Sequence, residues 1–420
     1  MMTPHTAVGE ITEMKTTYRL IYVSPDENSN KFWFSTIEDK VEKRTWGRVG
    51  SSGQHKTFTY YSHDEACVQV AAKAKSKFKK GYKEAQLLID GGTTQVGNLD
   101  LRTLALSQID TDGSSETKRL IEFLVDTNIH TITMNTSITY SGGQLKTALG
   151  VITKDAIRDA RRLLADIADM VNRNAQMTKR FDRVVADYLV VVPTKVGRKL
   201  VPADLFGSQD KIDKQVAILD AMDALVVVNG DAGNEAMFAM SIKPVSDKVF
   251  AQLDAARKKT SKSGHQSASL RMKRAWKVTI TNDQYDDSVG NVLQLWHGTK
   301  ASNLLSIFRK GLTIVPSGAS HTTGRMYGDG LYFSDVFTKA LNYATTFWGG
   351  RDEGRYFVLL ADVAMGRAYR PSDGYGRQSL PKPGYDSTFA EAGQSGTRNN
   401  EQIVYAESQA KIRYLLEFVR

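Results

Sequence analysis

The chain has few of the features that mark disulfide-stabilised, secreted or membrane-spanning proteins. Its 420 residues include one cysteine, Cys67, and this excludes an internal disulfide framework and any zinc site built from several cysteines. The longest apolar run, Leu189 to Val192, is far too short to span a bilayer. Residues 1–14 contain no apolar stretch typical of a secretory signal. We therefore expect a soluble intracellular protein with no membrane partner.

Composition and charge favour a multidomain globular protein with a polyanionic partner. The apolar fraction of 41% and the charged fraction of 24% are ordinary for a folded chain. At this length the chain is expected to form about two to four domains, each with its own core. The net charge of +10 indicates a partner such as nucleic acid, although charge alone does not determine the fold.

The strongest local pattern lies between Gly328 and Asp335. Two glycines predict a turn, and alternating residues after them predict a strand from Leu331 that enters the core. A short helical run then carries Asn342 and Tyr343 back towards the same place. The turn His297-Gly298-Thr299 follows an apolar strand, and Glu401 opens another strand. One His, two Tyr and one Glu at strand ends predict a pocket for a planar, polar ligand.

These motifs together resemble the catalytic domain of the poly(ADP-ribose) polymerases. The resemblance places the family's His-Tyr-Glu set at His297, Tyr332 and Glu401. It implies an ADP-ribosyltransferase fold over residues 236–420 that cleaves NAD, releases nicotinamide and transfers ADP-ribose, with NAD as the substrate and without a metal. Breaking the nicotinamide–ribose bond develops positive charge at the ribose C1, which a carboxylate such as Glu401 can stabilise.

The resemblance also implies a role for each matched residue. Glu401 would orient the acceptor hydroxyl, and Tyr332 and Tyr343 would hold the nicotinamide ring between them. Further NAD contacts are implied for His297, Gly298, Thr299, Asn303 and Lys339. Two positions depart from the family pattern: Ala340 stands where a serine usually binds the carboxamide oxygen, and Thr313 stands where DNA-dependent relatives often have arginine. Losing one neutral hydrogen bond costs about 1 kcal/mol, so we expect weaker NAD binding and not an inactive site.

The N-terminal residues 15–90 are predicted to form a small β-rich module closed by a helix from His63 or Asp64. The motif Trp46-Gly47-Arg48 and its surroundings resemble the WGR domain. That resemblance implies DNA binding, with Trp46 stacking at a DNA end and Arg48 pairing with a phosphate. The dense lysine run on the helix, Lys73 to Lys83, is either a solvated face or a further phosphate-binding surface.

Residues 98–232 are predicted to form an all-α bundle. A helix is expected over Thr117–Leu124, ended by a Thr-rich break, and Thr153 is expected to cap the next helix. The block resembles the helical regulatory domain that hinders NAD access in DNA-dependent relatives; the alternative is a plain spacer. We expect a linker near residues 90–98, a mobile exposed loop at 258–269, a loop over the site at 317–325, and loops on the acceptor side over 370–400.

The sequence thus predicts an α+β multidomain enzyme, a DNA-break-stimulated polymerase that modifies protein acceptors including itself. The nearest alternative is a mono-ADP-ribosyltransferase acting on protein or DNA ends. An alternative of another class is a DNA-end-binding scaffold with a vestigial transferase fold. We expect the protein in the nucleus of a eukaryotic cell and otherwise in the cytoplasm.

Overall fold

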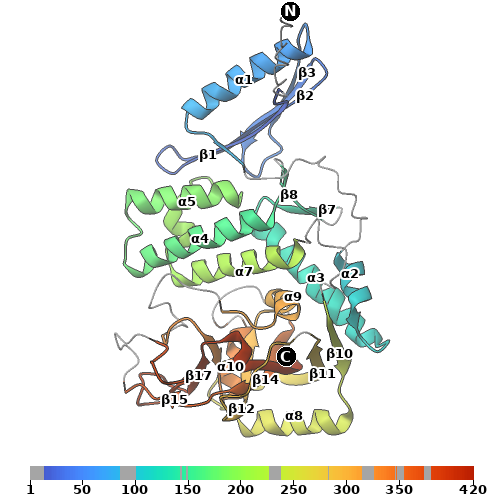
Figure 1. Cartoon of the computed structure of the whole chain (residues 1–420), viewed down its shortest axis with the longest axis vertical. Helices are drawn as coiled ribbons and strands as arrows, with labels where there is room; N and C mark the ends of the chain where they lie inside the picture. The colour runs from blue at the N-terminus through green and yellow to red at the C-terminus, as the bar shows by residue number, and fades with distance from the viewer. Residues whose placement is uncertain are drawn as a thin grey trace, which may run out of the picture.

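The computed structural model places three regions in succession along the longest axis of the molecule (Figure 1). The residues that it describes are 14–85, 101–141, 144–147, 150–226, 238–281, 283–314, 326–345, 347, 354–372 and 380–420. The expected linker at 90–98 and the expected loop at 317–325 lie outside these residues. None of the helices in the described part of the chain is long and apolar enough to cross a membrane.

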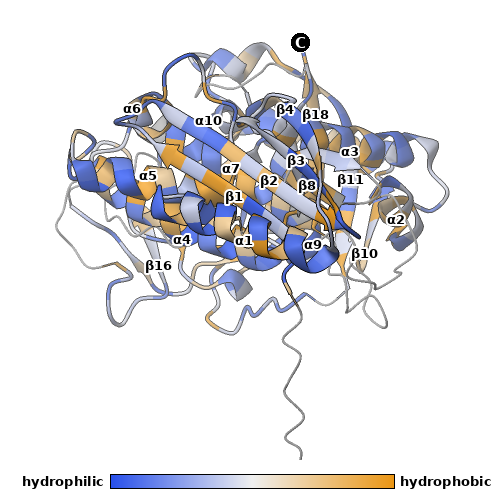
Figure 2. Ribbon diagram, turned by 90° about the horizontal axis from the view of Figure 1, so that it is seen from above, coloured by the Kyte–Doolittle hydropathy of each residue, from blue (hydrophilic) through white to orange (hydrophobic). Residues whose placement is uncertain are grey.

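The N-terminal module is a five-stranded sheet in the order β4-β3-β2-β1-β5, with one helix packed on it. Its strands and helix are β1 (Thr17–Ser24), β2 (Ser29–Glu38), β3 (Val41–Arg48), β4 (Gln54–Thr59), β5 (Lys83–Glu84) and α1 (His63–Lys79). Hydrophobic and polar residues are interleaved along the strands of this sheet (Figure 2). The predicted β-rich module with a closing helix is confirmed.

Helix α1 forms where the sequence places it because cap and core agree. The Ser62 hydroxyl accepts a hydrogen bond from the Glu65 amide and begins the helix. Ala66, Val70 and Ala74 then recur every four residues and pack on the sheet together with Trp33 and Leu20.

The middle region is a bundle of helices, which also contains the three-stranded sheet β7-β8-β9. Its elements are α2 (Leu101–Gln108), β6 (Ile109–Asp110), α3 (Ser115–Asn135), β7 (Thr139–Ser141), β8 (Gln144–Thr147), β9 (Gly150–Val151), α4 (Lys154–Asn172), α5 (Lys179–Val191), α6 (Pro202–Phe206) and α7 (Gln209–Leu225). The predicted cap of α4 is confirmed, since the Thr153 hydroxyl accepts from the Ala156 amide at 3.0 Å.

The expected Thr-rich break after Leu124 is wrong, because α3 continues to Asn135. Two threonine hydroxyls donate to the carbonyl four residues earlier, from Thr131 to Thr127 and from Thr136 to Ile132. These bonds satisfy the hydroxyls inside the helix. The apolar face, which extends to Ile132, is fully buried, so tertiary packing overrides the low helix propensity of threonine.

The C-terminal domain consists of two sheets with helices on them. The six-stranded sheet has the order β12-β14-β18-β11-β10-β6 and the four-stranded sheet the order β13-β17-β16-β15. The elements are β10 (Met240–Pro244), α8 (Asp247–Lys259), β11 (Arg271–Ile280), β12 (Val292–Thr299), α9 (Ala301–Lys310), β13 (Leu331–Phe333), α10 (Phe337–Ala344), β14 (Tyr356–Ala364), β15 (Ala368–Tyr369), β16 (Ser387–Ala390), β17 (Glu401–Val404) and β18 (Ala410–Val419).

The helical region is built into this domain and does not stand beside it as a separate body. Its short strand β6 pairs in parallel with β10 and forms the edge of the six-stranded sheet. An ion pair of 2.8 Å between Lys243 and Asp110 joins the same two strands. The predicted α+β multidomain class is confirmed, but the region predicted to be all-α also contains the strand β6 and the small sheet β7-β8-β9.

Two loop expectations need correction. The 258–269 segment is not simply exposed: it ends in the 3-10 helix Gln266–Ser269, and the buried Ser267 hydroxyl donates to the Thr338 carbonyl at 2.9 Å. Polar composition predicted exposure here, but the polar groups face the end of a neighbouring helix. The 370–400 segment contains the strand β16, and residues 373–379 of it lie outside the described part.

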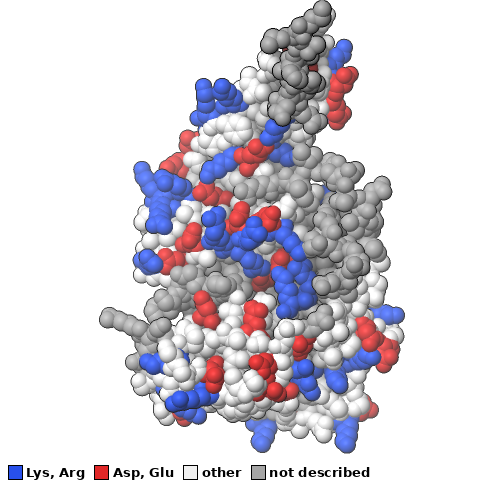
Figure 3. Space-filling model, in the orientation of Figure 1, with Lys and Arg blue, Asp and Glu red and all other residues white. Residues whose placement is uncertain are grey.

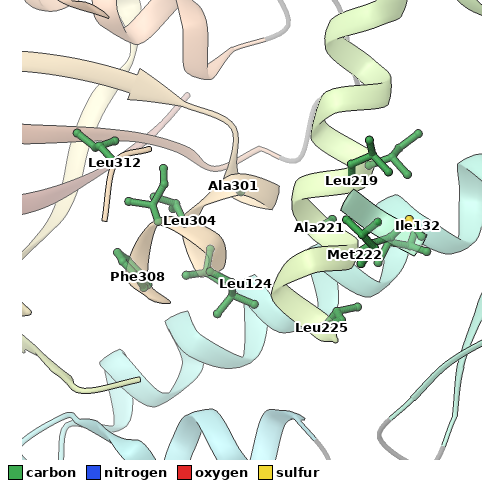
Figure 4. Close-up of a cluster of buried hydrophobic side chains, with 14 of the residues drawn as sticks. Leu124, Ile132, Leu219, Ala221, Met222, Leu225, Ala301, Leu304, Phe308 and Leu312 are labelled. Atoms are coloured by element: carbon green, nitrogen blue, oxygen red, sulfur yellow. The ribbon is translucent and has the colours of Figure 1, made fainter. Parts of the chain in front are cut away.

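One apolar core runs through both the helical region and the C-terminal domain. Figure 4 shows Leu124 of α3 beside Leu304 and Phe308 of α9, and Ile132 of α3 beside Met222 of α7. The contributors include Leu124 and Ile132 of α3, Leu219 and Met222 of α7, and Leu304 and Phe308 of α9. Each of these six side chains is at most 1% exposed, so water is excluded from this contact.

Ion pairs surround this shared core at the end of α7. The Asp223 carboxylate pairs with Lys310 and lies 3.7 Å from Arg309, both on α9, and it lies 4.0 Å from Arg161 on α4. Burial disfavours the ionised carboxylate, but the two cations of α9 outweigh burial and lower the pKa of Asp223. Charged side chains are also spread over the surface of this region, where Lys and Arg gather over α4 and α7 (Figure 3).

We predict that Asp223→Ala lowers the free energy of unfolding by about 2–4 kcal/mol, because the mostly buried Arg309 and the partly exposed Arg161 and Lys310 lose their partner. The matched control is Asp155→Ala, which removes an exposed ion pair with Arg158 and should cost less than about 0.5 kcal/mol. Thermal unfolding at pH 7 measures both. Because the folded-state pKa is lowered, the Asp223 contribution is present above pH 3.8 and is lost as the pH falls below it. Equal effects of the two substitutions would contradict the role assigned to Asp223.

Candidate active site

Strand pairing brings the predicted His, Tyr and Glu together. The Trp296 and Ser334 backbones exchange two hydrogen bonds of 2.9 Å, which join β12 to the chain just after β13. Strand β13 pairs with β17 up to Phe333–Gln402, so Glu401 lies beside the chain that follows β13. The His297-Gly298-Thr299 turn that the sequence predicts is instead the end of β12, which continues to Thr299.

His297 is held as a neutral imidazole with one free nitrogen lone pair. Its Nδ1 lies 2.9 Å from the Tyr332 carbonyl, and since a carbonyl only accepts, Nδ1 carries the proton. Burial lowers the pKa of His297, and the bond to the carbonyl opposes this only in part. Nε2 is therefore an acceptor at neutral pH, suited to a ligand hydroxyl.

Tyr332 uses its hydroxyl to fix the turn before its own strand. The hydroxyl donates to the Gly328 carbonyl at 2.8 Å and accepts from the Tyr327 amide at 2.9 Å. Because both hydrogen bonds occupy its phenol oxygen, Tyr332 is not suited to act as an acid or a base. It can contribute the face of its ring to a ligand site, and it fixes the preceding turn.

Gly298 is required by a close approach between β12 and α10. A Cβ atom at this position would lie 1.7 Å from the carbonyl oxygen of Ala340. The backbone groups of Gly298 point to the same edge of β12 as those of Trp296, away from β14, since alternate residues of a strand share a direction. That N–H and C=O are therefore directed at the space beside α10, where they can bind an amide group.

Helix α10 presents two site residues from consecutive turns. Tyr343 is 38% exposed and shares the helix with Lys339, four residues earlier. Partial burial raises the pKa of Tyr343 to about 12, with contributions from the charges of Glu401 and of Asp213 on α7. The phenol is therefore protonated at neutral pH. The charges of Glu401 and of Asp213 on α7 thus both act on this one ring.

Glu401 is paired with a lysine that the sequence alone assigned only as a further NAD contact. Lys339 Nζ lies 2.9 Å from Glu401 Oε1 and donates to the Asn400 carbonyl at 2.9 Å. The Lys339 and Glu401 side chains are 13% and 16% exposed. Burial lowers the pKa of Lys339, and the carboxylate of Glu401 opposes that shift. The lysine therefore fixes the direction of the carboxylate.

Asp335 contributes to this arrangement, although sequence reasoning gave it no role. Its Oδ2 accepts from Asn400 Nδ2 at 2.7 Å and so orients the residue next to Glu401. Its Oδ1 is buried and has no hydrogen-bond partner among the residues that the structure describes. Both Asp335 and Asn400 stand inside the recognised motifs, but only the tertiary structure shows that they meet.

The remaining predicted ligand contacts lie at the junction of β12 and α9. Asn303 Nδ2 donates to the Thr299 hydroxyl at 3.2 Å, and Lys300 donates to the Thr345 carbonyl. Of the two residues that depart from the family pattern, Ala340 is buried and Thr313 is exposed. No group of three or more His, Cys, Asp or Glu side chains that could hold a metal is found within the described ranges.

The predicted DNA contacts lie far along the chain from this pocket, at the end of β3. Trp46 is partly buried against the module's core. Arg48 donates to the Asn28 carbonyl at 3.3 Å and to the Gly197 carbonyl of the helical region at 3.0 Å. Arg48 thus joins two regions in this structure.

Three family models match the chain in succession. They are the WGR domain over residues 16–87, the regulatory domain of poly(ADP-ribose) polymerase over 114–236, and the poly(ADP-ribose) polymerase catalytic domain over 248–393. WGR domains bind nucleic acid, and the catalytic domain of this family uses NAD as its substrate.

Individual proteins match as well. The chain is 34% identical over 148 residues to a poly(ADP-ribose) polymerase-like protein of Invertebrate iridescent virus 6, covering 33% of this chain and 78% of that protein. It is 23% identical to poly [ADP-ribose] polymerase 2 of Arabidopsis thaliana over 93% of this chain and 71% of that one. Poly [ADP-ribose] polymerase 1 of Danio rerio is 26% identical over 91% of this chain and 42% of its own length.

We predict that Gly298→Ala abolishes binding in the pocket, because the new Cβ cannot share space with a main-chain carbonyl. Titration calorimetry with benzamide, a planar aromatic amide, measures the loss. The control is Gly264→Ala, where a Cβ meets nothing within 4 Å, and it should leave binding unchanged. If the Gly298 variant binds benzamide as the wild type does, the pocket lies elsewhere.

Proposed function

Because the chain belongs to the poly(ADP-ribose) polymerase family, we propose that it is a DNA-break-stimulated enzyme that builds ADP-ribose chains on proteins, itself included. Its activity as an ADP-ribosyltransferase rests on the family. The observation that supports chain formation is the Glu401–Lys339 pair, which lies beside the ring of Tyr343.

The proposed reaction breaks one bond and forms another at the same carbon. The C–N bond between nicotinamide and ribose breaks, and nicotinamide leaves with the electron pair. The ribose C1 then carries oxocarbenium character until the oxygen of an acceptor hydroxyl bonds to it. The proton of that hydroxyl passes to Glu401 and from there to solvent. Glu401 thus has two roles, to stabilise positive charge and to accept the proton.

The residues around Glu401 would hold the substrate for this step. The Gly298 backbone would bind the carboxamide, and the rings of Tyr332 and Tyr343 would enclose the nicotinamide so that it leaves in one direction. His297, as a neutral imidazole, would accept from a ribose hydroxyl at Nε2, with Thr299 and Asn303 beside it. Ala340 offers no hydroxyl to the carboxamide, so ground-state binding should be weaker than with serine by about 1 kcal/mol.

Lys339 would act on the reaction through Glu401. An ammonium 2.9 Å from the carboxylate favours the ionised form and prevents the side chain from turning away. Because both groups are mostly buried, this preorganised arrangement acts with little competition from water.

We predict that Glu401→Gln eliminates polymer and leaves at most feeble single addition or NAD hydrolysis. The amide keeps the shape of the side chain but removes the charge, an effect often worth about 3–4 kcal/mol. The control is Glu391→Gln, which removes a partly exposed carboxylate paired with Arg370 and should leave the products unchanged. Gel analysis of labelled NAD products is the measurement. Long polymer from the Glu401 variant would refute this assignment, and single additions by the wild type would replace it with mono-ADP-ribosylation.

DNA stimulation is proposed from the order of the regions and from the N-terminal module's charge. Between Lys15 and Glu84 the chain carries 14 Lys or Arg and 8 Asp or Glu, a net +6 of the +10 total. The helical region shares its core with α9, next to the pocket, and Asp213 of α7 acts on Tyr343. A helix in this position can restrict the pocket until DNA binding loosens it. Such a protein is expected in the nucleus of a eukaryotic cell.

We predict that Trp46→Ala and Arg48→Ala reduce stimulation by nicked DNA at least about tenfold, since one stacked base or charge-assisted bond is worth about 1–3 kcal/mol. Nicotinamide release with and without the nicked duplex is the measurement. Arg271→Ala, which removes an exposed cation of the C-terminal domain, is the control. Because Trp46 packs partly on the core, Trp46→Phe tests the indole while keeping an aromatic ring. Unchanged stimulation in the Trp46 and Arg48 variants would show that the N-terminal module does not sense DNA.

A further inference from the structure

A short basic segment of the helical region is docked on the WGR domain. This segment, Thr194–Leu200 and here termed the basic loop, connects α5 to α6. It contains Lys195, Arg198 and Lys199, all three exposed. Neither the catalytic proposal nor the packing of the helical core uses these side chains.

The backbone of the basic loop is fixed by WGR side chains. Asn28, in the left-handed conformation with φ 49°, donates to the Arg198 carbonyl at 3.1 Å and accepts from the Leu200 amide at 2.7 Å. Asn30 Nδ2 donates to the Thr194 carbonyl at 3.2 Å, and Arg48 donates to the Gly197 carbonyl at 3.0 Å. Four hydrogen bonds to four residues of the loop therefore hold it in one position on the WGR domain.

The cations of the basic loop have no carboxylate partner among the described residues. Some exposed cations elsewhere are paired, as Lys43 is with Glu38 and Arg158 with Asp155. Two acids, Asp26 and Glu27, lie in the turn of the WGR domain that faces the loop, but they interact with other residues. Asp26 faces Asp182, whose pKa is raised by burial and by that charge, and Glu27 bonds to Tyr22. The positive charge on the loop is left uncompensated.

The loop lies beside the residues assigned to DNA. Trp46 and Arg48 are two positions apart on β3 and so point to the same face of the sheet. Since Arg48 donates to the Gly197 carbonyl, the basic loop adjoins the end of β3 that carries Trp46 and Arg48.

We propose that the basic loop binds the phosphate backbone of DNA and extends the WGR surface onto the helical region. This inference rests on the proposed DNA binding by the WGR domain. Three exposed, uncompensated cations on a fixed backbone suit phosphates, whose recognition needs charge and position but no base contacts. One DNA duplex then contacts both the WGR domain and the helical region, which DNA binding is proposed to loosen.

The test uses the full chain and a nicked duplex, with affinity measured by fluorescence anisotropy at several salt concentrations. The triple variant K195A/R198A/K199A should bind about tenfold or more weakly at 150 mM salt, and its slope of log affinity against log salt should fall by about 2–3. The control K259A/K273A/K277A removes three exposed lysines of the C-terminal domain and should match the wild type. A triple variant that behaves like this control overturns the proposal.

A second measurement needs no variant and so does not depend on folding. Acetylation of lysines in the wild-type protein, read by mass spectrometry, should slow at Lys195 and Lys199 when nicked DNA is added. Lys259 and Lys273 should react equally with and without DNA. Equal reactivity of the loop lysines in both states overturns the proposal.

Trp46→Ala separates failure of this inference from failure of the proposed function. If it weakens DNA binding while the loop variant does not, the WGR domain binds DNA and the loop does not contribute. If neither variant affects binding and the wild-type lysines are not protected, the DNA-binding proposal fails as a whole.

Discussion

The packing of α7 against α9 is the contact on which the arrangement of the site depends. Helix α9 follows β12 directly, and the residues of that junction, from His297 to Asn303, line the candidate pocket. The contact is apolar and closed to water, and Asp223 with its three cations surrounds its edge. Because such interfaces switch between discrete packings and do not deform continuously, a displacement of α7 must alter the pocket wall.

Much of the fold was predictable from local patterns. Strand alternation, the start of α1 at His63 and the Thr153 cap each concern neighbouring residues, and the structure has them where they were expected. The wrong expectations have a common cause. The threonines of α3 and the polar 258–269 segment have compositions typical of breaks and exposed loops, but partners distant in sequence satisfy their polar groups or bury them.

The sequence predicts the candidate site as a set of residues and not as a geometry. The motifs identify His297, Tyr332 and Glu401, yet the approach of Gly298 to the Ala340 carbonyl joins a strand to a helix some forty residues later. The Lys339–Glu401 pair likewise spans two motifs, and each looked self-contained in the sequence. Contacts between distant segments leave no periodic trace in a single chain, so only the tertiary structure could reveal them.

The WGR domain is connected to the helical region both by hydrogen bonds and by an apolar contact. Val190 of α5 packs with Ile21, Phe32 and Val49 of the sheet, beside the docked basic loop. DNA can shift the helical region only by the difference in its affinity for the two states, and such couplings are typically about 1–3 kcal/mol. A polyanion that contacted the WGR domain alone would have to act through this interface. One that also contacts the loop acts on the helical region directly, so its differential affinity does not depend on the interface staying rigid.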